Sequence, residues 1–260
     1  MTTPAIELRD LSVVFNGEAG RVQALSNINL TIDPGEFVVL IGPSGQGKST
    51  LLNVIAGLLK PTEGEILAHG EAVSGPSRER AMVFQEDTVF PWMRVGANVD
   101  WALKLRGVAP DERKALTARY LEEVGLSHTA GAWPRELSGG MRKRVSLATA
   151  FAADPEVLLM DEPFGPLDFV TRSTLHSIVI RLWSEERKTI VFVTHDVDET
   201  LLLADRVLVI RHGEIVDDLR LDFARPRTDD LRADPDAIAM RRRLLDQLGV
   251  VDPARAALAR

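Results

Sequence analysis

The residues with the clearest chemical meaning form one short stretch that reads Gly-Pro-Ser-Gly-Gln-Gly-Lys-Ser-Thr and begins at Gly42. Gly42, Gly45 and Gly47 have no Cβ, so the backbone can curl there and turn its N–H groups toward a phosphate. Lys48 can reach phosphate oxygens, and the hydroxyl of Ser49 can bind Mg²⁺. This spacing is the P-loop pattern, which predicts a site for a nucleoside triphosphate.

The flanking sequence predicts the strand, loop and helix that a P-loop requires. Residues 37–41 are an apolar run typical of a buried strand, residues 49–56 have the composition of a helix, and Gly57 is placed to end it. The helix N-terminus adds the positive end of its dipole to the phosphate site. The alternative is a glycine-rich turn without a ligand, and the flanking elements argue against it. The other members of the predicted loop are Pro43, Ser44, Gln46 and Thr50.

Two acidic residues, Asp161 and Glu162, follow the apolar run at residues 157–160. Carboxylates at the end of a strand beside a P-loop strand lie where open α/β sheets bind ligands. Asp161 is expected to help hold Mg²⁺, and Glu162 to act on an attacking water as a general base. By itself such a pair is also compatible with a simple helix start, and the P-loop favours the functional interpretation.

A second anion-binding pattern, Ser138-Gly139-Gly140, stands at the start of a predicted helix and is followed by Met141. Backbone N–H groups at a helix start of this kind form a nest for an anion. One nucleotide does not need two such nests from the same chain. We therefore expect this segment to contact the nucleotide held by a second subunit.

Composition limits the classes of function. The chain has 260 residues, 45% of them hydrophobic, which suits one large domain or one domain with an inserted subdomain. The net charge of −7 argues against a nucleic-acid surface, and the absence of cysteine excludes disulfides and thiolate metal sites. The N-terminus does not resemble a signal peptide, and no apolar run approaches the roughly 20 residues of a membrane helix. The sequence predicts a soluble chain that reaches a membrane only through a partner.

The pattern of elements predicts an α/β fold with a helical insertion. The first third is rich in predicted strands, at 6–15, 29–32, 65–68 and 81–84. Residues 86–153 then contain two predicted helices, at 111–124 and 138–153. After this stretch, strands alternate with helices again, which predicts a largely parallel sheet covered on both faces. These later segments are strands at 157–160, 189–193 and 206–210, and helices at 171–183 and 197–203.

The end of the chain predicts an amphipathic helix at residues 236–248, whose flank carries Arg241, Arg242 and Arg243. Arginines in this position can contact lipid headgroups. The more ordinary interpretation, which we favour, is a charged face in contact with water.

Taken in order, these motifs resemble those of the ATPase subunits of ABC transporters, over nearly all of residues 5–220. The P-loop is similar to the family's Walker A motif, the segment from Leu137 to Met141 to its signature motif, and residues 157–162 to Walker B. Single residues match as well. The matches are Gly165-Pro166-Leu167-Asp168 to the D-loop, Gln85 to the Q-loop glutamine, His195 to the switch histidine, and Phe15 to an aromatic that stacks on adenine.

The resemblance implies that two copies face head to tail and enclose two ATP molecules. Each site would combine the P-loop of one copy with Ser138, Gly139 and Gly140 of the other, and the nucleotide contacts would include Met141 and Asp168. Three side chains would surround Mg²⁺, namely Ser49, Gln85 and Asp161. The three catalytic roles would be charge neutralisation by Lys48, polarisation of water by Glu162 and contact with the γ-phosphate by His195.

Each isolated match also has a plain structural alternative. Gln85 is compatible with a polar residue that ends a strand, His195 and Asp168 with helix caps, and Phe15 with the core. For single residues those alternatives are favoured. Their order along the chain, together with the P-loop, favours the functional interpretation.

Finer details resemble the ATPases of importers for nitrate, sulfonates and taurine. They are Phe84-Gln85-Glu86-Asp87, Phe90-Pro91-Trp92, the motif from Asp161 to Gly165, and the methionine of the signature. In that family the segment after Gln85 docks a membrane permease, so Phe90 and Trp92 would be anchors there. Ordinary core packing is the alternative for both aromatic rings.

The implied fold is an α/β P-loop NTPase core of the ABC type, with an antiparallel β subdomain and an inserted helical subdomain. We expect the core at residues 1–85 and 154–222, the helical subdomain at 86–153, and a helical tail at 223–260. The implied function is ATP hydrolysis at the cytoplasmic face of the inner membrane, for a small-anion importer that also uses a solute-binding protein. The alternatives are an exporter or lipid-trafficking ATPase and, with less support, a soluble ABC ATPase outside transport.

Overall fold

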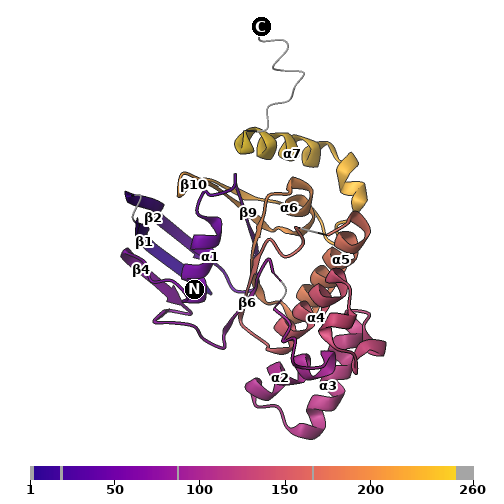
Figure 1. The fold of residues 1–260 in the computed structure, drawn as a ribbon. Coiled ribbons are helices and arrows are strands. Elements are labelled where there is room, and N and C mark those ends of the chain that lie inside the picture. Colours follow the sequence, from indigo (N-terminus) through magenta and orange to yellow (C-terminus); the bar gives the residue numbers. More distant parts are fainter. Residues whose placement is uncertain (1–2, 18–19, 87, 166, 250–260) are drawn as a thin grey trace.

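The computed structural model describes residues 3–17, 20–86, 88–165 and 167–249, and its centre is a six-stranded sheet (Figure 1). Five neighbouring strands of this sheet run parallel, and the strand at one edge is antiparallel. This arrangement confirms the predicted α/β class. In spatial order the strands are β10 (Glu214–Arg220), β9 (Arg206–Arg211), β3 (Phe37–Ile41), β8 (Thr189–Thr194), β7 (Val157–Asp161) and β6 (Arg80–Val83).

The central strands are apolar along their whole length because both faces of the sheet are covered. In β3, for example, all five side chains are buried. Val38 and Leu40 point into a core shared with helix α1 (Lys48–Ala56), whereas Val39 and Ile41 point into a second core on the opposite face. The second core is formed with α4 (Gly139–Ala152), α5 (Phe169–Glu186) and α6 (Val197–Leu203).

A second, antiparallel sheet packs against the α1 side of the molecule, at the left in Figure 1. Its strands are β2 (Gly20–Ile32), β1 (Ile6–Gly17), β4 (Glu63–Ala68) and β5 (Glu71–Ala72). The β1–β2 pair has three register shifts, which break the strict alternation of buried and exposed residues. For this reason the sequence pattern predicts only the last four residues of β2.

Three helices lie between β6 and β7 along the chain: α2 (Val95–Arg106), α3 (Pro110–Glu123) and α4. Helices α3 and α4 were predicted from the sequence, whereas α2 was not. Helix α2 contains Gly96 in its first turn, and its N-cap residue Arg94 makes no side-chain capping bond, so the usual start signals are absent. Gly96 is explained by packing, because a Cβ there would lie 3.2 Å from the carbonyl oxygen of Ala130. Two short 3₁₀ turns complete this region, Ser127–Thr129 and Pro134–Glu136.

The C-terminal part runs from a 3₁₀ turn, η3 (Asp229–Ala233), into α7 (Pro235–Leu248), at the top of Figure 1. Leu244 anchors α7, since its side chain is fully buried. Of the three arginines, Arg241 and Arg243 are exposed but bound to carboxylates of the protein body, at 2.9 Å from Asp198 and 2.7 Å from Asp217. This face is charged and solvent-exposed, as favoured from the sequence, with two arginines held in ion pairs.

Several local expectations need correction. Phe84 lies outside β6, which ends at Val83, and α1 begins one residue earlier than predicted, at Lys48. The N-cap of α6 is Asp196, so the interpretation of His195 as a helix cap is wrong.

Pro166 of the predicted D-loop, Asp87, and residues 250–260 of the predicted tail lie outside the described residues. Among the helices within the described ranges, none is both long and apolar enough to cross a membrane.

Candidate nucleotide-binding site

The P-loop forms the turn between β3 and α1, where two glycines lie too close to neighbouring backbone to carry a side chain. A Cβ at Gly42 would lie 2.2 Å from the carbonyl oxygen of Ile210, and one at Gly47 would lie 2.4 Å from that of Ala24. Gly47 also has a φ of 98° and is the N-cap residue of α1. Packing and backbone conformation therefore both require glycine at position 47.

The side chain of Lys48 folds back against the backbone of the P-loop. Its side chain is almost fully buried, and Nζ donates hydrogen bonds to the carbonyl oxygens of Gly42 and Pro43, both at 2.8 Å. Burial lowers the pKa of the Lys48 ammonium, and the nearby carboxylates of Glu162 and Asp161 oppose that effect. A phosphate in the loop would offer this ammonium stronger, charged acceptors than the two carbonyls.

Ser49 and Asp161 meet across the gap between α1 and the end of β7. The hydroxyl of Ser49 donates to Oδ1 of Asp161 at 3.1 Å. Burial raises the pKa of Asp161, and the hydrogen bond from Ser49 partly offsets that increase. Two hard oxygen donors this close together fit neighbouring positions around Mg²⁺, whose ligand oxygens lie at ~2.1 Å in an octahedron. The described residues contain no cluster of three or more His, Asp or Glu side chains able to hold a metal. Mg²⁺ does not require such a cluster, because it commonly completes its coordination shell with substrate phosphates and water.

The raised pKa of Asp161 predicts that its ionised carboxylate destabilises the folded protein at neutral pH. The folded chain holds the Asp161 proton at pH values above 3.8, the ordinary pKa of this carboxyl group. It therefore binds more protons than the unfolded chain in that window, and stability falls as pH rises through it. Asp161→Asn should unfold at a higher temperature than the wild type at pH 7 without nucleotide, with a difference that shrinks in acid. Thermal unfolding across this pH range tests it, with exposed Asp222→Asn as control. A lower melting temperature for Asp161→Asn at pH 7 would contradict it.

Glu162 and His195 face one another at the ends of two adjacent strands. Oε2 of Glu162 lies 3.3 Å from Nδ1 of His195, whose side chain is 64% exposed. Glu162 has a φ of 41°, and its backbone N–H donates to the carbonyl oxygen of Val193 at 3.0 Å. A non-glycine residue in the left-handed region is uncommon, and such strain often marks a functional position. The pair offers a carboxylate and an imidazole to the same small hollow, which Gly165 also lines.

Gln85 reaches the same place from the end of β6. A Cβ built at Gly165 would lie 3.8 Å from Nε2 of Gln85 and 3.9 Å from Oε2 of Glu162. The amide of Gln85 and the carboxylate of Glu162 therefore flank one glycine. This brings together side chains from three strand ends, those of β6, β7 and β8.

Phe15 and Gln46 connect the P-loop with other parts of the fold. Phe15 pairs with Val22 in the antiparallel sheet, two residues from Ala24, whose carbonyl touches the P-loop. Phe15 is 45% exposed, so its interpretation as a core residue is wrong. Gln46 accepts a hydrogen bond from the N–H of His212 at 2.6 Å, which links the loop to the β9–β10 turn.

The second predicted anion site begins a different helix. Ser138 is the N-cap of α4, and its hydroxyl accepts a hydrogen bond from the N–H of Met141 at 3.3 Å. A Cβ at Gly140 would lie 2.6 Å from Cγ2 of Thr171 in α5, so the glycine allows the two helix starts to pack closely. Asp168 caps α5 and accepts hydrogen bonds from Thr171, chiefly from its hydroxyl, which lower the pKa of the carboxyl. The capping interpretation of Asp168 is therefore confirmed.

The polar residues that support the loop of His195 were not predicted from the sequence. Glu199, only 5% exposed, accepts a hydrogen bond from the Thr194 hydroxyl at 2.7 Å and lies 3.1 Å from Nε2 of His176. Arg172 binds Asp196 at 3.0 Å and the carbonyl oxygen of Leu167. The available signal was a charged or polar residue on the otherwise apolar face of a helix.

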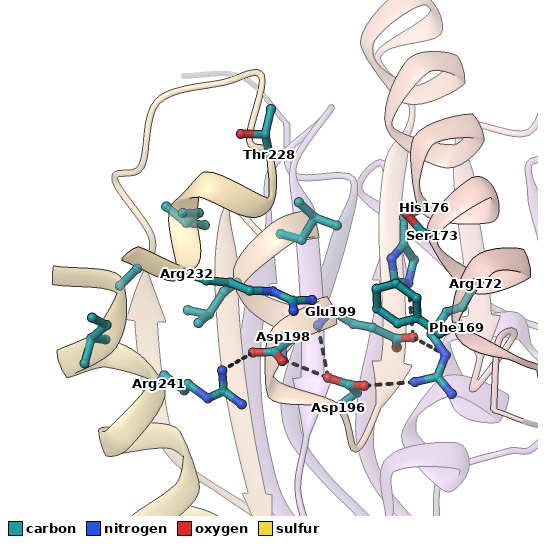
Figure 2. A pocket seen from close by; sticks show the side chains of 15 residues that line it. Phe169, Arg172, Ser173, His176, Asp196, Asp198, Glu199, Thr228, Arg232 and Arg241 are labelled. Atoms are coloured by element: carbon teal, nitrogen blue, oxygen red, sulfur yellow. Dashed lines mark hydrogen bonds and ion pairs between the residues drawn. The ribbon is translucent and has the colours of Figure 1, made fainter. Parts of the chain in front are cut away.

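These supporting groups line a cavity of about 210 Å³ between α5, α6, η3 and α7 (Figure 2). In this view Arg172 points toward Asp196, and Arg241 of α7 points toward Asp198. None of the P-loop residues lines the cavity. The cavity is therefore separate from the P-loop, and Asp196, the residue after His195, is part of its lining.

Comparison with known proteins gives a result that agrees with these motifs. A family model described as ABC transporter matches residues 25–165, more than half of the 260 residues. The nitrate import ATP-binding protein NrtD of Synechocystis sp. is 48% identical over 220 residues, which are 84% of this chain and 83% of that protein. The aliphatic sulfonates import ATP-binding protein SsuB 3 of Nocardia farcinica is 46% identical over 252 residues, or 97% and 94%. The taurine import ATP-binding protein TauB of Jannaschia sp. is 45% identical over 231 residues, or 87% and 86%.

Solved structures agree with this result. The dimeric structure of a post-hydrolysis state of the ATP-binding cassette MJ0796, bound to ADP and Pi, has a TM-score of 0.76 and 31% identity. The match covers 84% of this chain and all of that one. The predicted architecture, with its antiparallel sheet and helical subdomain, is thereby confirmed. The likeness extends over sequence, fold and P-loop, and the chain belongs to the ABC transporter family of ATP-binding proteins.

Proposed function

We propose that this chain is the ATP-hydrolysing subunit of an importer for a small anion such as nitrate, a sulfonate or taurine. The observation that carries the ATPase part is the convergence of Lys48, the Ser49–Asp161 pair and the Glu162–His195 pair at one edge of the sheet. The importer part rests on relatives whose names specify import of nitrate, aliphatic sulfonates and taurine.

In the proposed reaction the chain positions ATP and water and stabilises developing charge. Lys48 and the P-loop N–H groups hold phosphate oxygens, with Pro43, Ser44 and Thr50 as part of the same loop. Ser49, Asp161 and Gln85 would hold Mg²⁺, which neutralises phosphate charge when bound. Glu162 accepts a proton from the attacking water, and His195 contacts the γ-phosphate.

The proposed site is completed by a second copy of the chain. Ser138, Gly139, Gly140 and Met141 form the start of α4, where the N–H groups of the two glycines would face an anion, and the P-loop forms the start of another helix. Their contribution to a partner's nucleotide explains why one chain carries both. The dimeric state of the MJ0796 cassette, described with ADP and Pi, supports this arrangement. Asp168 would lie close to the same interface, and Phe15 would stack on adenine. Closure of the pair on ATP and its opening after hydrolysis would drive transport.

The segment after Gln85 is proposed to dock the permease. Trp92 is 71% exposed, so the core-packing alternative is wrong for this ring. It packs against the tilted ring of Phe90, with 5.4 Å between the ring centroids. Buried Asn98 fixes the loop, because it accepts from the N–H of Phe90 at 2.7 Å and donates to the carbonyl oxygens of Met93 and Arg94. Exposed aromatic side chains on a rigid loop are typical anchors of a protein interface.

Trp92→Ala should weaken assembly with the permease without changing nucleotide affinity. Loss of one aromatic anchor is expected to reduce assembly on the order of tenfold or more, since such residues contribute about 2 kcal/mol or more. Co-purification of the tagged chain with its membrane subunits measures the effect, and nucleotide titration of the purified chain checks the site. Val216→Ala, which changes an exposed apolar residue of β10, is the matched control. Unchanged assembly of the Trp92 variant would count against an anchor there.

The proposal divides the chain as the motifs suggest. Residues 1–85 and 154–222 would form the nucleotide-binding core, 86–153 the helical subdomain that carries the signature, and 223–260 a C-terminal tail. The chain would bind the cytoplasmic face of the inner membrane through its permease. A solute-binding protein would be an indirect partner, and no nucleic acid is involved.

Affinity purification from native membranes in mild detergent tests the proposal directly. We expect Mg²⁺-dependent ATP hydrolysis and co-purification of a permease with several membrane spans and of a solute-binding protein. Binding of nitrate, taurine and alkanesulfonates to that protein would then identify the solute. Lipid-trafficking or export components, or soluble partners alone, would overturn the importer and leave the ATPase intact. Absence of ATP hydrolysis in the purified complex would overturn the ATPase itself.

A further inference from the structure

Lys143 is a buried cation that the proposed mechanism does not use. It lies in the second turn of α4, and only 2% of its surface is exposed. Its Nζ donates hydrogen bonds to three consecutive carbonyl oxygens, those of Phe84 at 2.7 Å, Gln85 at 2.8 Å and Glu86 at 3.4 Å. An ammonium carries three N–H donors and can serve several carbonyls at once, so the backbone after β6 curls around this charge.

The backbone held by Lys143 carries outward-facing side chains. Phe84, Gln85 and Glu86 are all exposed, although their carbonyl oxygens point inward to the ammonium. The Gln85 amide lies beside Gly165, as does the carboxylate of Glu162. The position of this amide therefore depends on where the ammonium holds the backbone. The same segment leads directly into the loop of Phe90 and Trp92.

Lys143 also belongs to the helix whose start is proposed to contact the partner's nucleotide. Lys143 follows Gly139 and Gly140 by about one helical turn, and Ser138 caps the same helix. A short stretch of α-helix is stiff, so the first turn of α4 and the ammonium move together. Burying an ammonium is costly unless its donors are satisfied, which makes this contact a specific one rather than an incidental surface bond.

We propose that Lys143 is a positioning residue that fixes the Gln85 segment relative to the first turn of α4. Through this contact, the glutamine that would approach Mg²⁺ and the helix start that would approach the partner's nucleotide keep one relative position. The inference rests on the proposed function, since it assigns Lys143 a role in that ATPase site. Loss of the ammonium should misplace Gln85 while leaving the P-loop untouched.

The test compares Lys143→Met, which removes the donors, with Lys143→Arg, which retains a buried cation with several donors. Lys188→Met is the matched control, because Lys188 is 9% exposed and pairs with Asp154 at 2.5 Å, outside the nucleotide site. Each purified chain is assayed for ATP hydrolysis against ATP and against Mg²⁺, at a temperature where thermal unfolding shows it folded. Lys143→Gln, which keeps two donors, replaces the Met variant if that does not fold.

We expect Lys143→Met to lower kcat on the order of tenfold and to raise the Mg²⁺ concentration for half-maximal rate several-fold, since small displacements at a catalytic site have effects of this size. KM for ATP should change little, and Lys143→Arg should recover part of kcat. Lys188→Met should lose thermal stability with the wild-type Mg²⁺ dependence. Wild-type kcat and Mg²⁺ dependence in Lys143→Met, or an equal Mg²⁺ shift in Lys188→Met, would overturn the inference alone. A wild-type chain without Mg²⁺-dependent hydrolysis would overturn the proposed function as well.

Discussion

Replacement of Glu162 with Gln is expected to reduce ATP turnover by about 10³-fold and to leave ATP binding intact, because general-base catalysis has an effect of this order. The amide is nearly isosteric with the carboxylate but cannot accept the proton of an attacking water. Glu162 lies at the end of β7 in a left-handed conformation and faces His195 at 3.3 Å. A side chain of the same size keeps this geometry, so the loss should be confined to the chemical step.

The same variant should accumulate as a nucleotide-bound dimer. If ATP closes two copies and hydrolysis opens them, a chain that binds but does not cleave ATP stays closed. Single-turnover hydrolysis, nucleotide titration and sedimentation with ATP measure the three expectations together. Glu156→Gln is a suitable control, since Glu156 is an exposed carboxylate just before the start of β7. Turnover near the wild-type rate in Glu162→Gln would refute the general-base role.

The second large effect is expected for Gly47→Ala, which should abolish most nucleotide binding. The new Cβ would lie 2.4 Å from the carbonyl oxygen of Ala24 and 2.9 Å from a methyl group of Leu25. The residue must also keep a φ of 98°, which L side chains rarely adopt. Relief of both strains requires the backbone to move, and the N–H groups of the loop would then no longer converge on a phosphate.

Gly45→Ala separates these two causes. Gly45 also has a positive φ, of 74°, but a Cβ there meets nothing within 4 Å. The Gly45→Ala variant should be destabilised only by the unfavourable backbone conformation, by ~1 kcal/mol. Gly47→Ala should be destabilised by the same conformational cost and also by the disturbed packing of α1 against β2. Isothermal titration with ATP and thermal unfolding of both variants measure the difference. Equal ATP affinity in the two variants would show that the Ala24 contact does not determine the loop.

Several parts of the fold could be predicted because their signals are local. The P-loop strand and helix, the buried strand before Asp161 and the cap of α4 each depend on residues close together in sequence. Helix α2 was missed because Gly96 and the weak cap at Arg94 are explained only by packing against Ala130. The long strand β2 was underestimated because register shifts interrupt its alternation.

Exposure was decided by tertiary contacts rather than by residue type. Phe15 and Trp92 are aromatic and would commonly be buried, yet their exposed fractions are 45% and 71%. In contrast, Lys143 and Glu199 are charged and almost fully buried. No local pattern distinguishes these cases, because burial depends on which distant segments cover a side chain.

By itself the sequence determined the chemistry available to this protein, since motifs such as residues 42–50 and the pair Asp161-Glu162 act through spacing within one segment. Only the tertiary structure decided which segments meet. It placed Ser49 beside Asp161, Glu162 beside His195, and Lys143 under the backbone of Gln85. The physical reason is that the sheet brings the carboxyl ends of strands far apart in sequence to one edge, and side-chain contacts between them follow from packing of the whole chain.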